Sequence, residues 1–465
     1  MGTSVDPICE KEERGVRTMY QKTAQKLLDF ISQSPSCYHV VDNFKKRLEA
    51  EGFEELQEHE GWDLAPGGGY YVTRNGSSII AFTLPHLPVT NFLIAASHSD
   101  SPTFKIKENP EMLVDGHYLE LNAEGYGGML CSTWFDRPLS IAGRAVVSTT
   151  AGVASRLVNF DRDLVMIPSC ANHMNRKAND GYSYNLQKDM IPLFGQETDQ
   201  GSFMKLLAEE LQVEPEEILG TDLFLYNRTR GCIWGSDDEF IASPKLDDLE
   251  CAYSTMEALI GIKHKLDADE FYAGTSVNIC AVFDNEEVGS STRQGADSSF
   301  LEDILGRIGQ DYAMSAEEYL CCLAGSFMVS ADNAHAVHPH HLDKADPTNR
   351  PYMNRGVVIK YNANQKYTTD AVSAAVFRRI CETADIPVQT YVNRSDVPGG
   401  STLGNLSGRH VSINSVDIGL AQLAMHSSYE TAGVMDVWHL QQAVEAFFGT
   451  AVNRIADGQY ETRTL

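Results

Sequence analysis

The stretch Asp284-Asn285-Glu286-Glu287-Val288-Gly289-Ser290 directly follows an apolar, β-branched run, TSVNICAVF at 275–283. Such a run is typical of a buried strand in a parallel sheet. Open α/β sheets bind their ligands beyond the carboxyl ends of these strands, which is where the two glutamates lie. We therefore expect this stretch to mark both the sheet and the site.

The two glutamates are expected to do different jobs. Adjacent residues on extended backbone point to opposite sides, unless the turn at Gly289 reorients Glu286 and Glu287. One carboxylate could hold a metal ion while its neighbour carries protons for metal-bound water. An isolated Glu-Glu pair is more often a solvated acidic turn, so the interpretation depends on the rest of the chain.

The composition indicates a globular protein of more than one domain. A chain of 465 residues is too long for one simple core. With 37 Lys and Arg against 64 Asp and Glu, the formal net charge is -27, which argues against nucleic acid and anionic membranes as partners. The ten cysteines show no Cys-x-x-Cys spacing, and we see neither a secretory signal nor a membrane-spanning run. We therefore expect a cytoplasmic protein with reduced thiols.

The chain changes character twice. Residues 1–103 and 244–465 alternate helical and strand-like patterns, which predicts an α/β fold with a mixed, mostly parallel sheet flanked by helices. Between them, strand-like segments dominate and one helix is expected at 203–211. The sequence therefore predicts a discontinuous α/β domain, 1–103 with 244–465, interrupted by an inserted β-rich domain over 104–243.

Polar side chains follow other expected strands as well. His98 and Asp100 follow the strand at 92–96, and at this spacing the carboxylate can hydrogen-bond the imidazole. Asp248 suits the N-cap region of the next helix, but this explains only one of the two aspartates and leaves Asp247 without a structural role. The complete set of strand-end residues is His98, Asp100, Asp247, Glu286, Glu287, Asp332 and His426.

These side chains should converge on one edge of a mostly parallel sheet. The mixed nitrogen and oxygen set suits zinc, or cobalt or manganese, and contains no cysteine, which argues against a structural zinc. The carboxylates are too many for one tetrahedral ion. They fit two ions bridged by one carboxylate.

Other candidates are weaker. His173 is a lone histidine and, by itself, is more safely read as a structural, hydrogen-bonded residue. Lys360 ends the expected strand at 357–360 and could equally be solvated or paired with a structural carboxylate. The turn at 396–402 contains Gly400 and Ser401 before an expected helix, where backbone N–H groups can meet an anion.

Five segments carry a resemblance to a known family. They are SHSDSP at 97–102, KLDDL at 245–249, DNEEVGS at 284–290, SADNAHAVHP at 330–339 and MHS at 425–427. These segments look like the signatures of the aspartyl aminopeptidase family, peptidase family M18, and the match covers essentially the whole chain. The resemblance implies a zinc-peptidase fold of the phosphorylase/hydrolase-like type, interrupted by a dimerisation domain.

The resemblance also implies a ligand set for two divalent ions, zinc in preference to cobalt or manganese. His98 and Asp332 would bind one ion, Glu287 and His426 would bind the other, and Asp247 would bridge them.

The remaining roles follow from the same resemblance. Glu286 would be the general base on the bridging water, and Asp100 would orient His98. In the family, dimers assemble into a tetrahedral dodecamer, and His173 matches a histidine that reaches the neighbouring subunit's site. Lys360 matches the position expected to contact an acidic side chain of the substrate, and we expect His335, Gly400 and Ser401 to bind substrate with it.

The function predicted from the sequence is therefore a binuclear metal-dependent aminopeptidase that prefers N-terminal Asp or Glu. The same reaction with a neutral, leucine-like preference is an alternative, because the family contains such members. A metal-dependent carboxypeptidase or deacylase on the same scaffold, or a non-catalytic assembly protein, also stays open.

Overall fold

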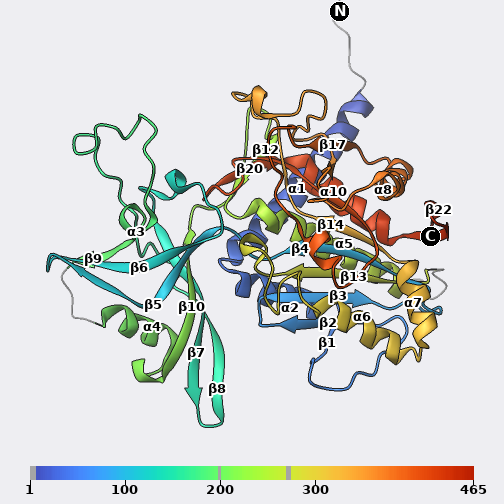
Figure 1. The fold of residues 1–465 in the computed structure, drawn as a ribbon, viewed down its shortest axis with the longest axis horizontal. Coiled ribbons are helices and arrows are strands. Elements are labelled where there is room, and N and C mark those ends of the chain that lie inside the picture. The colour runs from blue at the N-terminus through green and yellow to red at the C-terminus, as the bar shows by residue number, and fades with distance from the viewer. Residues whose placement is uncertain (1–6, 197–200, 269–273) are drawn as a thin grey trace, which may run out of the picture.

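The chain folds around a nine-stranded sheet covered by helices on both faces (Figure 1). The computed structural model describes residues 7–196, 201–268 and 274–465. In spatial order the strands are β1 (Glu54–Glu55), β2 (Gly69–Arg74), β3 (Ser78–Thr83), β13 (Ser276–Phe283), β4 (Asn91–His98), β14 (Phe327–Ala331), β18 (Asn414–Gly419), β16 (Val357–Tyr361) and β17 (Val388–Val392).

The sheet is mixed and mostly parallel, which confirms the predicted fold class. Its centre, β13-β4-β14-β18, is parallel throughout, whereas β2, β3 and the pair β16–β18 supply the antiparallel contacts. Because parallel strands end at the same edge, this centre collects the residues that follow β13, β4 and β14.

Successive side chains of β4 point to opposite faces of the sheet and are buried on both, which explains why helices cover both faces. Leu93 and Ala95 belong to one buried cluster, and Phe92, Ile94 and Ala96 belong to the other. Helices α1 (Pro7–Gln33), α2 (Cys37–Ala50), α5 (Leu246–Ala268), α8 (Ala371–Thr383) and α10 (Val434–Phe448) contribute to the first cluster. Helices α6 (Phe300–Asp311), α7 (Ala316–Ala324) and α9 (Leu403–Ser407) contribute to the second.

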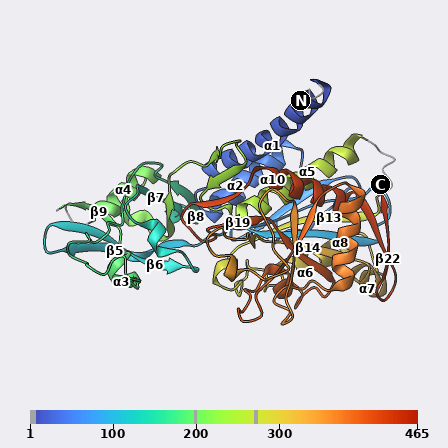
Figure 2. The same ribbon diagram turned by 90° about the horizontal axis from the view of Figure 1, so that it is seen from above.

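A six-stranded antiparallel sheet forms the other end of the molecule (Figures 1 and 2). Its strands are β8 (Gly152–Asn159), β7 (Leu139–Thr149), β10 (Ile218–Asn227), β5 (Thr103–Val114), β6 (Tyr118–Tyr126) and β9 (Leu193–Gln196). Helix α4 (Ser202–Leu211) packs on it and joins a separate hydrophobic core that includes Phe104, Ile141 and Leu207.

A smaller sheet ties the two parts of the chain together. Strand β11 (Cys232–Trp234) pairs with β12 (Phe240–Ser243), and β12 pairs with β20 (Glu430–Gly433), which is followed in the sheet by β19 (Ala421–Leu423) and β15 (Ala334–His335). Thus β11 and β12 lie within 104–243 in sequence, but they share a sheet with strands from the C-terminal half of the chain. The C-terminal hairpin is β21 (Thr450–Ala456) with β22 (Gln459–Thr464).

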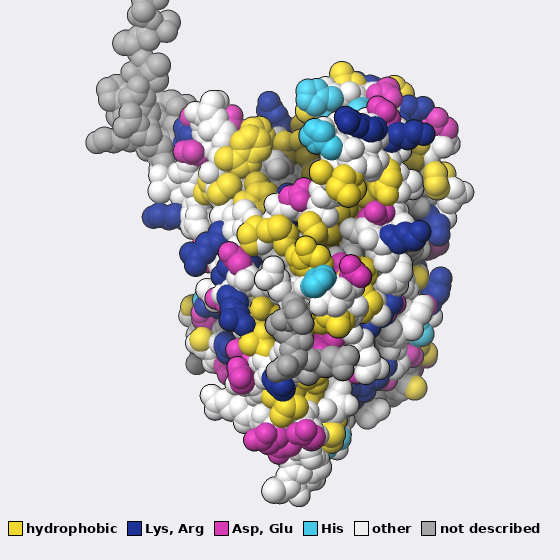
Figure 3. Space-filling model, turned by 90° about the vertical axis from the view of Figure 1, so that its left-hand side faces the viewer, with side chains coloured by type: hydrophobic (Ala, Val, Ile, Leu, Met, Phe, Trp, Pro, Cys, Tyr) yellow, Lys and Arg dark blue, Asp and Glu magenta, His cyan; other side chains and the backbone are white. Residues whose placement is uncertain are grey.

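The end of the molecule that carries the six-stranded sheet exposes many hydrophobic side chains, seen among charged ones in Figure 3. Val153 is 67% exposed, Met174 82% and Leu219 57%. Such apolar surface is typical of a face that contacts another protein. No helix within the described part of the chain is both long enough and apolar enough to cross a membrane.

Candidate metal centre

The central strands bring the predicted residues to one edge of the large sheet. His98 is the last residue of β4 and pairs in register with Phe283, the last residue of β13. Glu286 and Glu287 therefore lie beside it, in the short 3-10 helix Glu286–Val288 that follows β13. Asp332 directly follows β14, the strand on the other side of β4.

Asp247 enters from the start of α5. Its backbone is not helical, and its N–H donates to Glu430 Oε2 at 3.0 Å while its carbonyl accepts from Ser101 Oγ at 2.8 Å. The peptide bond that joins it to Asp248 is cis. These contacts hold the side chain over the edge of the sheet instead of on the outside of a helix.

His426 comes from the loop between β19 and β20. Its backbone has φ +66°, a left-handed conformation, and its N–H donates to Glu430 Oε1 at 2.7 Å. Its Nδ1 lies 2.8 Å from the Gly128 carbonyl, which can only accept, so Nδ1 carries the proton. This leaves Nε2 directed at the carboxylates, 3.4 Å from both Asp247 Oδ2 and Glu287 Oε1.

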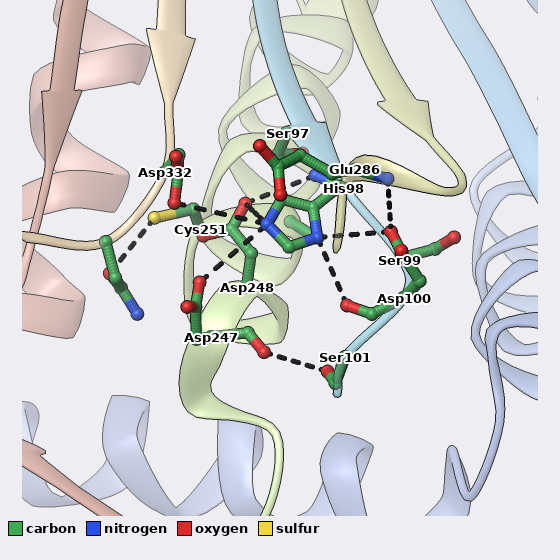
Figure 4. A network of polar contacts seen from close by, with 12 residues as sticks. Ser97, His98, Ser99, Asp100, Ser101, Asp247, Asp248, Cys251, Glu286 and Asp332 are labelled. Carbon is green, nitrogen blue, oxygen red and sulfur yellow. Dashed lines mark hydrogen bonds and ion pairs between the residues drawn. The ribbon is translucent and has the colours of Figure 1, made fainter. Parts of the chain in front are cut away.

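Several carboxylates lie around the imidazole of His98 (Figure 4). Its Nε2 lies 3.7 Å from Asp247 Oδ1, 3.9 Å from Asp248 Oδ2 and 4.0 Å from Asp332 Oδ1. Its other nitrogen, Nδ1, lies 3.1 Å from the backbone carbonyl oxygen of Asp100 and 3.3 Å from Asp100 Oδ1.

Potential ligand atoms converge in three overlapping groups. The first is His98, Asp247, Asp248 and Asp332, the second is His98, Glu286 and Glu287, and the third is Asp247, Glu287 and His426. Within each group the atoms lie within 4.8 Å of one another. Asp247 belongs to the first and third groups, which places it between two possible ion positions.

The donor set fits divalent metal ions. Asp247 Oδ1 and Glu287 Oε1 are buried, and neither has a hydrogen-bond partner among the described residues. A buried carboxylate oxygen without a partner is costly, and a cation at this position would remove that cost. Carboxylate and imidazole are also the ligands that zinc, cobalt and manganese accept.

The pKa shifts point to an excess of negative charge. Burial, together with the neighbouring Asp247, raises the pKa of Glu287 well above its ordinary value. Burial likewise raises the pKa of Glu286 to about 8. Although burial lowers the pKa of His426, the carboxylates of Asp247 and Glu287 raise it to about 10. Glu286, Glu287 and His426 all hold protons more tightly than usual, whereas for Asp247 the effect of burial is outweighed by the neighbouring histidines, which lower its pKa; this indicates a site that attracts positive charge.

Three residues at the centre escaped the sequence interpretation. Asp248 was expected near a helix N-cap, but it is fully buried and accepts a hydrogen bond from the His98 N–H at 3.2 Å. Glu430 anchors two candidate ligands through their backbone, and Tyr126 donates to Asp100 Oδ2 at 2.7 Å. Only the Asp-Asp pair left a signal in the sequence; the other two depend on long-range contacts.

A cavity of about 200 Å³ adjoins the cluster. It is lined by the predicted substrate residues Lys360, His335, Gly400 and Ser401, together with aromatic side chains such as Tyr367 and Tyr391. Lys360 is buried, donates to the Asp332 carbonyl at 2.7 Å and lies 3.4 Å from Asp332 Oδ2. Its ammonium is thus already paired with a candidate metal ligand.

His173 does not join this centre in a single chain. It is exposed in the segment between β8 and the short helix α3 (Leu186–Asp189), and it is absent from the ligand groups formed by the described residues. A role in the site would need a second subunit.

Comparisons with known proteins give matches over most of the chain. The profile of the family "Aminopeptidase I zinc metalloprotease (M18)" matches residues 30–448. "Probable M18 family aminopeptidase 2" of Clostridium acetobutylicum is 45% identical over 91% of this chain and 98% of its own length. The protein of the same description from Ectopseudomonas mendocina is 40% identical over 93% and 99%.

Solved structures show the same fold. The matching chain in "Cryo-EM structure of the Ape4 and Nbr1 complex" has a TM-score of 0.87 at 34% identity, covering 92% of this chain and 86% of that one. The chain in "Structure of S. cerevesiae mApe1 dodecamer" has a TM-score of 0.81 at 26% identity, covering 92% and 97%. With a matching profile across most of its length and close relatives over nearly all of it, the chain belongs to the M18 family of metallo-aminopeptidases.

Proposed function

We propose that the chain is a binuclear aminopeptidase. The observation that carries this proposal is the position of Asp247, whose two carboxylate oxygens face His98 Nε2 at 3.7 Å and His426 Nε2 at 3.4 Å. A carboxylate shared in this way suits a bridge between two ions. His98 with Asp332 would hold one ion, and Glu287 with His426 would hold the other.

When bound, the ions would polarise the peptide carbonyl and make a nearby water more acidic. Glu286 would accept the proton of that water and deliver it to the leaving amine. It suits this task because its backbone N–H is fixed to Asp100 Oδ1 at 3.1 Å, while its carboxylate stays beside His98. Asp100 would orient His98 through Nδ1.

We propose that the cavity beside the cluster selects the N-terminal residue of the substrate, with a preference for Asp or Glu. Lys360 supplies a cation there, and His335, Gly400 and Ser401 offer further polar contacts. A neutral, leucine-like preference is the second candidate. The pairing of Lys360 with Asp332 and the aromatic rings of Tyr367 and Tyr391 favour it.

A panel of aminoacyl amides of Asp, Glu and Leu tests both specificities. The metal-loaded protein should hydrolyse them with added zinc, cobalt or manganese, and a chelator should abolish the reaction. Metal analysis should give two ions per chain. Hydrolysis of none of the amides by protein with a full metal content would contradict the proposal.

We also propose that residues 104–243 serve as a dimerisation domain and that dimers build a tetrahedral dodecamer. The exposed hydrophobic side chains on this part of the chain support such contacts, and the related mApe1 was solved as a dodecamer. In that assembly the exposed His173 would reach the neighbouring subunit's site. Size-exclusion chromatography with light scattering tests the particle mass.

The described cysteines are free, which agrees with a reducing compartment such as the cytoplasm. The net charge of -27 speaks against nucleic acid and anionic membranes as partners, so peptides remain the proposed ligands.

A further inference from the structure

Tyr126 connects the six-stranded sheet to the candidate metal centre. It is the last residue of β6, and its ring packs edge-on against Phe224 of β10 at 5.5 Å between centroids. Its hydroxyl donates to Asp100 Oδ2 at 2.7 Å and accepts from Asn285 Nδ2 at 2.9 Å. A phenol can make both bonds at once, whereas a phenylalanine ring can make neither.

Asp100 links the Tyr126 hydroxyl to the residues of the candidate metal centre. Its Oδ1 accepts from the Glu286 N–H at 3.1 Å and lies 3.3 Å from His98 Nδ1, while its Oδ2 accepts from the Glu287 N–H at 3.1 Å. One carboxylate therefore fixes the end of β4 relative to the turn after β13. Tyr126 is the side-chain donor that holds Oδ2 in place.

Asn285 donates a hydrogen bond to the Tyr126 hydroxyl, and its own side chain is held by two further hydrogen bonds. Its side-chain oxygen accepts from Thr292 Oγ1 at 2.8 Å and from Gln294 Nε2 at 2.8 Å. The amide is thus oriented, with its nitrogen directed at Tyr126. Asn285 has φ +63°, so the turn that carries Glu286 depends on this residue for its shape.

The residues that follow Tyr126 form a wall of the same centre. Gly127 has φ +76°, and a Cβ at this position would lie 3.1 Å from Glu287 Cβ, so the backbone approaches Glu287 closely. Gly128 accepts from His426 Nδ1, and the Leu130 N–H donates to the His426 carbonyl at 2.9 Å. Residues 127–130 thus contact Glu287 and His426, the two candidate ligands of one ion, and Tyr126 contacts Asp100, which lies beside His98.

We propose that Tyr126 is a positioning residue of the metal centre and that segment 126–130, which begins with the last residue of β6 in the six-stranded sheet, is a structural part of that centre. The inference rests on the proposed function only in taking His98, Glu287 and His426 as metal ligands. Loss of the Tyr126 hydroxyl removes the shorter of the two hydrogen bonds to Asp100 Oδ2, leaving the one from the Glu287 N–H, and leaves the Asn285 amide nitrogen without its acceptor. His98 and the Glu286–Glu287 turn then lose their fixed relative position.

The test compares Tyr126→Phe with Tyr118→Phe. Tyr118 lies on the same strand and is 50% exposed, and its hydroxyl makes no hydrogen bond with another described residue, so it controls for the loss of a hydroxyl from β6. We expect Tyr126→Phe to weaken zinc affinity, measured by competition with a chelator, by about 10- to 100-fold. The visible absorption spectrum of the cobalt-loaded protein should change, because it reports ligand geometry. Tyr118→Phe should match the unmodified protein in both measurements.

Asn285→Gly provides a second variant, because glycine tolerates the positive φ at this position. It removes the donor to Tyr126 and should shift zinc affinity and the cobalt spectrum in the same direction. If both variants bind zinc within twofold of the unmodified protein and give its cobalt spectrum, the inference is wrong. Because both measurements are independent of turnover, they remain decisive even if no aminoacyl amide is hydrolysed, an outcome that would contradict only the proposed function.

Discussion

His426 Nε2 lies 3.4 Å from Asp247 Oδ2, although the two residues come from different elements and neither is held by regular secondary structure. Glu430 explains the contact, because its carboxylate accepts the backbone N–H groups of both residues at 3.0 and 2.7 Å. Glu430 is itself buried at the start of β20 and pairs in register with Ser243 of β12. The small sheet thus determines where the two candidate ligands meet.

Glu286→Gln should retain metal but lose most of its activity. The amide cannot accept a proton, and general base catalysis typically contributes about 10²- to 10⁴-fold to the rate. We expect kcat to fall by about 10²-fold or more with metal content unchanged. Steady-state kinetics and metal analysis on the same sample check this. Full activity at normal metal occupancy would show that Glu286 has another role.

Asp247→Asn should lose metal as well as activity. An amide has no negative charge to bridge two cations, and Asp247 Oδ1 has no hydrogen-bond partner among the described residues. We expect the bound metal, measured by elemental analysis, to fall from two ions per chain to one or fewer. Asp115→Asn is the matched control, because Asp115 lies in the turn between β5 and β6 at φ +50°, which asparagine tolerates. Equal metal content in the two variants would contradict the bridging role.

Removal of metal should destabilise the folded protein. The unpartnered oxygens of Asp247 and Glu287 and the raised pKa of Glu287 indicate repulsion that cations relieve. A ligand present at 100 times its dissociation constant stabilises the native state by about 2.7 kcal/mol. Thermal unfolding should therefore shift upward when zinc is returned to chelated protein. An unchanged midpoint would mean that the carboxylates tolerate each other without metal.

Lys360→Met should reduce selectivity for acidic residues if Lys360 contacts the substrate. Hydrogen bonds to charged groups contribute about 1.5–3 kcal/mol, which corresponds to roughly 10- to 100-fold in the ratio of kcat/KM for Asp over Leu amides. Lys366→Met, an exposed lysine of the following loop, is the control. Because Lys360 also pairs with Asp332, metal content must be measured first. An unchanged ratio at full metal content would favour the neutral preference.

His39 should make stability depend on pH below neutrality. Burial lowers its pKa to about 4, so the unfolded chain, with a histidine pKa near 6.5, takes up the proton first. Stability is therefore unaffected well above pH 6.5 and is lost as the pH falls from 6.5 towards 4. The full loss is about 3 kcal/mol. Urea unfolding of chelated protein at pH 7.5 and pH 5 should show a smaller drop for His39→Gln than for the unmodified chain.

His59→Gln is the control for that experiment, because the His59 side chain is 79% exposed. It should keep the pH dependence of the unmodified protein. The same dependence in His39→Gln would show that other groups cause the loss of stability.

The sequence by itself determined the fold class and most of the candidate site. Buried strands can be recognised from short apolar runs, and in a parallel sheet their carboxyl ends share one edge, so His98, Glu287 and Asp332 could be placed together before any contact was known. Only the tertiary structure decided the rest. Asp248 is pinned by the backbone of His98, and Glu430 and Tyr126 act through partners that lie far away in sequence. Local patterns carry no information about such partners, because these hydrogen bonds form only when elements far apart in the sequence pack together.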